Sequence, residues 1–196
     1  MIKFLVFIFI ALFLTGCNKN TLEWNGYCLP YEKLSPASLA VSSKAEEGFD
    51  SASNYGPTLF FSAQSISEKI DDYKTYSTDP LFGQYHHNIQ VNLSETEITI
   101  PPTNKDTLEA SGIKDIYFEK LSEYDWNAFL KLDKTYQFWG HCMLDGRGEK
   151  KEGYSCTRQL KVDDIVLTFD LENTHIPVSK HIDEFLVNQL NNWRCD

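Results

Sequence analysis

A chain of 196 residues is long enough to bury the core of one domain, and its 42% hydrophobic residues supply side chains for that core. The 28 acidic residues outnumber the 18 basic ones, which gives a net charge of -10. This balance argues against nucleic acid as a partner, because phosphate contacts need clustered Lys and Arg. It would attract a basic protein or a cationic ligand instead, although the charge could also serve solubility alone.

The first residues carry the features of an export signal. Lys3 precedes an uninterrupted apolar run of eleven residues, from Phe4 to Leu14. A membrane-spanning helix needs about 20 residues, so this run has the length of a signal-peptide apolar region instead. It is followed directly by Thr15, Gly16 and Cys17.

The tetrapeptide Leu14-Thr15-Gly16-Cys17 resembles the lipobox of bacterial lipoproteins at every position. The resemblance implies export, cleavage after Gly16, and lipidation of the Cys17 thiol; the alternative is an ordinary signal peptide with a coincidental cysteine. Asn18 is not the aspartate associated with inner-membrane retention in enteric-type bacteria. The resemblance therefore implies a palmitate-bearing outer-membrane protein that faces the periplasm, if the organism has an outer membrane.

This interpretation divides the chain into three parts. Residues 1–16 are the signal peptide, residues 17–27 are a lipidated tether with the segment leading into the fold, and residues 28–196 are a single domain. The short tether predicts a domain that stays close to the membrane surface.

Four cysteines remain once Cys17 is assigned to lipid, and an even number in an exported chain indicates two disulfides. Cys142 and Cys156 flank a Gly-rich, charged segment typical of a hairpin loop, so we favour their pairing among the three possible connectivities. The second bridge would then join Cys28 to Cys195, at the two ends of the domain. A zinc site is the weaker alternative, because no Cys-x-x-Cys or Cys/His ligand spacing occurs.

The order of apolar residues predicts an α+β fold, mainly an antiparallel sheet with a C-terminal amphipathic helix packed on it. Alternation or clustering of apolar residues predicts strands at residues 59–61, 89–93, 98–100, 113–118, 136–139 and 160–169. A short helix is expected over residues 66–73. A second is expected after Ser122 as N-cap, because Trp126, Phe129 and Leu130 would share one face.

The strongest helix prediction follows Pro177. Its apolar residues form one stripe, while Asp183 and Glu184 are among the polar residues expected on the opposite side. The stripe comprises Ile182, Phe185, Leu186, Leu190 and Trp193.

Motifs of catalysis are lacking from the sequence. It contains no Gly-x-Ser-x-Gly turn, no His-Glu-x-x-His metal pattern and no phosphate-binding loop. His86 and His87 are adjacent, so on a strand they would point to opposite faces. We therefore predict no catalytic residue, no metal and no cofactor, while a hydrolase or small-ligand site built from histidines or carboxylates that meet in space stays an alternative.

An acidic, tyrosine-rich segment at residues 71–87 is the predicted partner-binding region, and we expect it to be a loop. Tyrosine beside acidic residues is typical of protein-binding surfaces, although an ordinary connection with partly buried aromatics would have the same composition. The candidate residues are Asp71, Asp72, Tyr73, Tyr76, Phe82 and Tyr85.

The combination of lipobox, size, charge and cysteines predicts a membrane-anchored lipoprotein that binds another protein. Its organisation is similar to that of immunity lipoproteins, which neutralise toxins of interbacterial competition, and the acidic charge suits a basic secreted toxin. A structural or assembly lipoprotein of an envelope complex is the alternative with constitutive partners.

Overall fold

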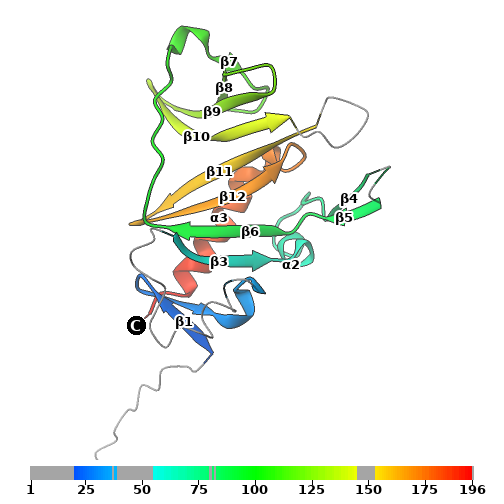
Figure 1. Cartoon of the computed structure of the whole chain (residues 1–196), viewed down its shortest axis with the longest axis vertical. Helices are drawn as coiled ribbons and strands as arrows, with labels where there is room; N and C mark the ends of the chain where they lie inside the picture. The colour runs from blue at the N-terminus through cyan, green and yellow to red at the C-terminus, as the bar shows by residue number, and fades with distance from the viewer. Residues whose placement is uncertain are drawn as a thin grey trace, which may run out of the picture.

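Antiparallel strand pairing dominates the computed structural model of this chain (Figure 1). The structure describes residues 20–36, 38, 55–79, 81, 83–144 and 153–195. The predicted signal peptide, Cys17, Phe82 and residues 145–152, where the sequence predicts a hairpin loop, lie outside these ranges. Across them, no helix is both long and apolar enough to cross a bilayer.

The main sheet has eight strands, each antiparallel to its neighbours, which confirms the predicted α+β class with a mainly antiparallel sheet. In spatial order the strands are β3 (Tyr55–Phe61), β6 (Ile89–Ser94), β12 (Ile165–Glu172), β11 (Tyr154–Val162), β10 (Thr135–Leu144), β9 (Asp125–Leu132), β8 (Ile116–Lys120) and β7 (Glu109–Ala110).

Smaller elements surround this sheet. Two hairpins pair β1 (Thr21–Trp24) with β2 (Tyr27–Pro30) and β4 (Tyr76–Asp79) with β5 (Gly83–His86). The described helices are α2 (Ala63–Ser67), α3 (Ser179–Asn192) and the single 3-10 turns η1 (Tyr31–Lys33), η2 (Lys105–Thr107) and η3 (Ile176–Val178).

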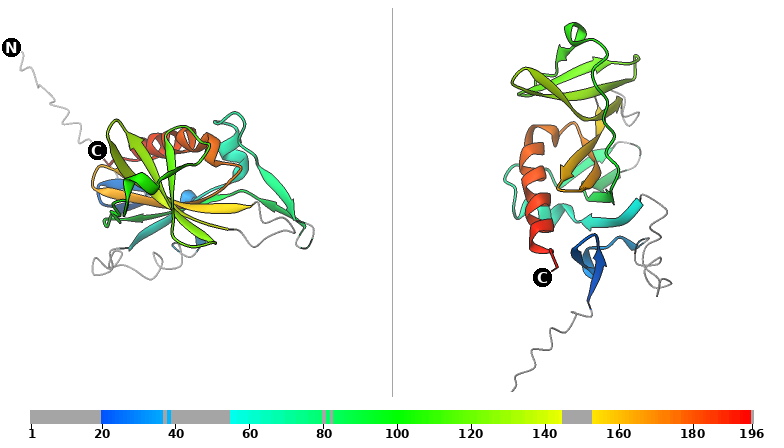
Figure 2. Two further views of the ribbon diagram at one scale, coloured as in Figure 1. Left: turned by 90° about the horizontal axis from the view of Figure 1, so that it is seen from above. Right: turned by 90° about the vertical axis from the view of Figure 1, so that its left-hand side faces the viewer.

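Helix α3 covers one face of the sheet, as Figures 1 and 2 show. Its apolar stripe buries Ile182, Leu186 and Leu190 in the same core as Leu167 and Phe169 of β12. Alternate residues of β12 point to the helix because side chains of a strand alternate between its two faces. The predicted C-terminal amphipathic helix is therefore confirmed.

The chain that runs from β6 to β7 passes along the ends of the intervening strands, on the side away from α3 (Figures 1 and 2). The backbone N–H of Ile98 donates to Gln159 Oε1 at 3.2 Å, and that of Thr103 donates to Glu119 Oε1 at 2.6 Å. The strand predicted at residues 98–100 is wrong, since this segment has no strand structure and Ile98 is exposed. Strand β6 already pairs with β3 on one side and β12 on the other, so no ladder is open to a returning strand.

The helix predicted after Ser122 is also wrong. Ser122 lies in a turn, where its Oγ accepts the Tyr124 N–H at 3.0 Å, and β9 follows from Asp125. Both edges of β9 are paired, with β8 and with β10, so the sheet overrides a helical spacing of apolar residues that is short and weak. The predicted loop at residues 71–87 contains the β4–β5 hairpin instead.

Both predicted disulfides are confirmed. Cys142 of β10 lies directly opposite Cys156 of β11, and the two are bonded. Cys28 is bonded to Cys195, and the N–H of Cys28 also donates to the carbonyl of Trp193 at 2.6 Å. The β1–β2 hairpin is thereby joined to the end of α3.

Loss of the Cys28–Cys195 bridge should destabilise the protein strongly. The bridge closes a loop of 167 positions, so Cys28→Ala/Cys195→Ala should lower the free energy of unfolding by about 2–5 kcal/mol in urea titrations. Cys142→Ala/Cys156→Ala is the matched control, and its loop of 14 positions should contribute about 3 kcal/mol at most. Unchanged stability of the first variant would contradict a stabilising role for the bridge.

An ion pair between α3 and β11 fixes the position of the helix on the sheet. Arg158 of β11 donates from Nη2 to Asp183 Oδ2 at 2.9 Å and from Nη1 to the carbonyl of Trp139 at 2.8 Å. Burial raises the pKa of Asp183, and the Arg158 guanidinium only partly offsets this shift. The sequence predicts Asp183 on the side opposite the apolar stripe, but it is partly buried, because its carboxylate binds the arginine beneath the helix.

Removing one charge of the Arg158–Asp183 pair should lower the free energy of unfolding more than removing the charge of an exposed residue. Asp183→Asn should lower the free energy of unfolding by about 3 kcal/mol, because the buried Arg158 guanidinium loses its counter-ion. Glu184→Gln is the control, since Glu184 is exposed and lies 3.9 Å from Lys180; it should change stability by about 0.5 kcal/mol or less. Equal losses of unfolding free energy for the two variants in chemical denaturation would contradict a special contribution of the Arg158–Asp183 pair to stability.

Candidate functional site

A cluster of histidine, tyrosine and glutamate side chains joins the β4–β5 hairpin to the body of the protein. His87 follows β5 directly, Glu172 ends β12, and His175 lies in the turn before η3. His87 and His175 are 5% and 2% exposed, which is unusual for side chains that titrate near neutral pH. We call these three residues, with Ser77, Tyr73 and Tyr85, the histidine cluster.

His87 stands at the centre of this cluster. Its Nδ1 lies 3.3 Å from Glu172 Oε1, and its Nε2 lies 2.8 Å from Ser77 Oγ. A carboxylate can only accept, so Nδ1 carries the proton and Nε2 accepts the Ser77 hydroxyl. The hydrogen bonds therefore run from β4 through His87 to β12.

His175 packs against this arrangement from the side of the body. Its Nε2 donates to the carbonyl of Lys74 at 2.8 Å, and its ring stacks on Tyr73 with centroids 4.5 Å apart. The His87 and His175 rings meet edge to face at 4.6 Å. The Tyr73 hydroxyl donates to the carbonyl of His87 at 2.5 Å, so it binds one histidine while stacking on the other.

The cluster favours neutral histidines. Burial lowers the pKa of His87, although the Glu172 carboxylate opposes this shift. Burial also lowers the pKa of His175; the hydrogen bond to the Lys74 carbonyl opposes this shift, and the neighbouring His87 adds to it. Protonation would place two cations side by side in a site from which water is excluded, so we expect both rings to be uncharged at neutral pH.

The order Ser77–His87–Glu172 matches the hydrogen-bonded order of a serine hydrolase triad. Catalysis also needs space for an acyl group and donors for the oxyanion. Ser77 lies in a strand opposite Tyr85, and it does not line any of three pockets formed by described residues. What the hydrogen bonds show directly is that they connect the hairpin to β12. The described residues include no group of three or more ligands arranged to hold a metal ion.

The predicted partner-binding residues divide into two groups. Asp71, Asp72 and Tyr76 are exposed, with 49% of the surface of Tyr76 accessible. Tyr73 is buried in the histidine cluster, and Tyr85 is half-buried, with its hydroxyl donating to Glu172 Oε2 at 3.3 Å. Phe82 lies outside the described residues.

The other histidines lie apart from the cluster. His86 and His181 are exposed, and His141 Nδ1 lies 3.2 Å from Asn127 Oδ1 on the face opposite α3. The expectation that His86 and His87 point to opposite sides agrees with their exposure, because one is exposed and the other buried. Sequence reasoning missed Ser77 and Glu172, which no motif connects to His87.

Comparison with known proteins adds no further assignment. The chain matches no known protein family, no curated protein and no solved structure. The functional argument therefore depends on the chain's own residues.

Acid should destabilise the protein through the histidine cluster. Each folded-state pKa lies below that of an unfolded histidine, 6.5, so this contribution is fully present above that pH and is lost as pH falls below it. The free energy of unfolding should therefore drop between about pH 7.5 and about pH 5. His87→Gln should flatten this pH dependence, whereas His86→Gln, at the exposed neighbour, should leave it unchanged. An identical pH profile in all three proteins would contradict the assignment.

Proposed function

We propose that this protein is a membrane-anchored periplasmic lipoprotein that acts by binding another protein. The lipobox supports the anchor, and the net charge of -10 supports a basic partner. The observation that carries the proposal is the β4–β5 hairpin, a projecting element that exposes apolar side chains.

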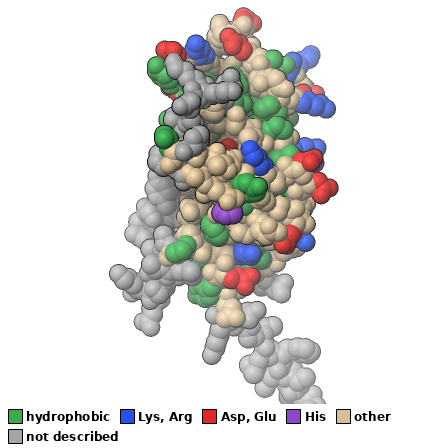
Figure 3. Space-filling view, turned by 90° about the vertical axis from the view of Figure 1, so that its right-hand side faces the viewer, with side chains coloured by type: hydrophobic (Ala, Val, Ile, Leu, Met, Phe, Trp, Pro, Cys, Tyr) green, Lys and Arg blue, Asp and Glu red, His purple; other side chains and the backbone are tan. Residues whose placement is uncertain are grey.

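The hairpin extends sideways from the sheet (Figures 1 and 2). Tyr76 on β4 is 49% exposed, and Leu81 in the connection to β5 is 83% exposed. On the face from which the hairpin projects, hydrophobic side chains reach the surface at several places over the middle of the molecule, with both acidic and basic side chains around them (Figure 3). Aromatic and aliphatic anchors surrounded by polar residues are typical of protein interfaces.

The histidine cluster suits the hairpin to binding. Hydrogen bonds from Ser77 and Tyr85 hold both strands of the hairpin to His87 and Glu172. A surface that is ordered before contact loses less conformational entropy on binding. This supports recognition of a protein by a preformed element.

The anchor would keep this surface close to the membrane. Asn20 is the first described residue, three positions after Cys17, and three residues span at most about 10 Å. The β1–β2 hairpin would then lie next to the lipid, with β7 to β9 at the far end of the molecule (Figure 1).

A toxin of interbacterial competition is the partner class that we favour within this proposal. An acidic, membrane-anchored protein is suited to capture a basic enzyme that enters the periplasm. A structural role in an envelope complex is the alternative. A neighbouring gene for a secreted effector would favour the first, and genes for an envelope complex would favour the second.

The proposal predicts a protein partner that depends on the hairpin. The full-length acylated protein should capture a specific protein from envelope extracts that include secreted proteins, and Tyr76→Ala/Leu81→Ala should weaken that capture about tenfold or more. Tyr124→Ala/Leu132→Ala is the matched control, because these residues are 58% and 46% exposed near the far end of the sheet. The control should bind as the natural chain does.

Two results would count against this function. Recovery of no specific partner would contradict it, and equal capture by both double variants would remove the hairpin from the interface. The same extracts test the anchor, because Cys17→Ala should move the chain from the membrane fraction to the soluble fraction.

A further inference from the structure

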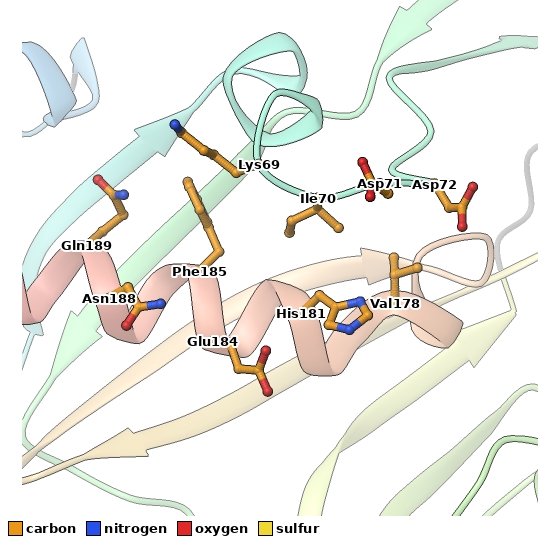
Figure 4. A pocket seen from close by; sticks show the side chains of 10 residues that line it. All are labelled: Lys69, Ile70, Asp71, Asp72, Val178, His181, Glu184, Phe185, Asn188 and Gln189. Carbon is orange, nitrogen blue, oxygen red and sulfur yellow. The ribbon is translucent and has the colours of Figure 1, made fainter.

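An open groove lies between α3 and the turn that follows α2 (Figure 4). Its volume is roughly 490 Å³, which is large enough for one long side chain of a partner. One wall is the segment Lys69–Asp72, and the other is the outward side of α3.

The centre of the groove is apolar. Ile70 lies on one wall and Phe185 on the other, and Val178 lies toward one end (Figure 4). Phe185 is held in place from below by Phe61, whose ring it meets edge to face at 5.4 Å. The groove is therefore lined by side chains that the core already positions.

The end near Val178 is acidic. Asp71 and Asp72 both lie there with exposed side chains (Figure 4), and neither makes an ion pair with any residue the structure describes. Lys69, the only lysine or arginine among the lining residues, lies toward the other end, and Glu184 is already within 3.9 Å of Lys180. An apolar groove that ends in carboxylates without a cationic partner among the described residues is complementary to a long cationic side chain.

We propose that this groove receives an arginine or lysine side chain of the protein partner. The aliphatic stem would lie against Phe185, beside the largely buried Ile70, and the charged head would meet the carboxylates of Asp71 and Asp72. This inference rests on the proposed protein-binding function and adds the chemistry of the contact. Asp72 precedes Tyr76 by only four positions, so the groove and the hairpin can serve one continuous interface.

The rigidity of both walls supports this assignment. Ile70 is 4% exposed, and α3 is held by its apolar stripe and by the Arg158–Asp183 pair. A rigid groove selects a side chain by fit, while exposed carboxylates add mainly selectivity for charge.

A blocked tripeptide with a central arginine, acetyl-Gly-Arg-Gly-amide, tests the groove directly. Titrated into the 15N-labelled protein, it should shift the amide signals of residues 69–72 and 178–189. The same peptide with citrulline in place of arginine keeps the shape of the side chain but removes its charge, so it should bind about tenfold more weakly. Added salt should weaken the arginine peptide only.

Asp71→Asn/Asp72→Asn should weaken the arginine peptide about tenfold without loss of fold, since asparagine tolerates the left-handed conformation of Asp72, φ 65°. Asp106→Asn/Glu109→Gln removes the same charge from exposed positions near the far end of the sheet and should leave binding unchanged. Equal affinity for both peptides, or equal loss in both variants, would overturn the proposal. Concentration-dependent dimers that disappear in the first variant would also overturn it, because a second copy would then occupy the groove.

The outcome is separable from that of the proposed function. Capture of a partner that survives Asp71→Asn/Asp72→Asn would overturn the groove and leave the protein-binding function standing. Specific peptide binding without any captured partner would leave the groove as a cation site and overturn the protein-binding function.

Discussion

Burial of Ile182, Leu186 and Leu190 against the sheet positions α3, and most of the exposed features of this protein depend on that contact. The helix forms one wall of the groove through Phe185, and the turn that leads into it carries His175. Apolar contact alone is not directional, because it depends mainly on the area removed from water. The Arg158–Asp183 pair and the Cys28–Cys195 bridge fix the orientation of α3. The ion pair joins the helix to β11, and the disulfide joins the residue after its end to β2.

The histidine cluster fixes the position of the β4–β5 hairpin, as the ion pair and the disulfide fix that of α3. A two-stranded hairpin is only marginally stable alone in water, so its position must be set by contacts at its base. His87, Glu172 and His175 supply those contacts with hydrogen bonds and ring packing. These contacts use neutral, buried imidazoles, so protonation at low pH should weaken the attachment of the hairpin. Apolar side chains in the same place would not respond to pH.

Several elements could be predicted from local patterns because those patterns match the final environment. Alternating apolar residues at 89–93 became β6, the apolar stripe after Pro177 became α3, and the cysteines flanking the hairpin loop were paired as expected. The errors at residues 98–100 and after Ser122 have one common cause. Whether a segment pairs depends on which strand edges are free, and neighbouring residues do not contain that information.

By itself, the sequence determined the antiparallel α+β class, the amphipathic last helix, the even number of cysteines left for disulfides and the acidic charge, because composition and short periodicities specify these properties. Only the tertiary structure decided the candidate sites. Ser77, His87 and Glu172 are brought together by a hairpin that folds back on the end of β12, and Asp71 and Asp72 face a groove only because α3 passes beside them. Such sites depend on contacts between residues that are far apart in the chain. Neither the local spacing of residues nor the composition of the chain predicts which of those side chains will meet.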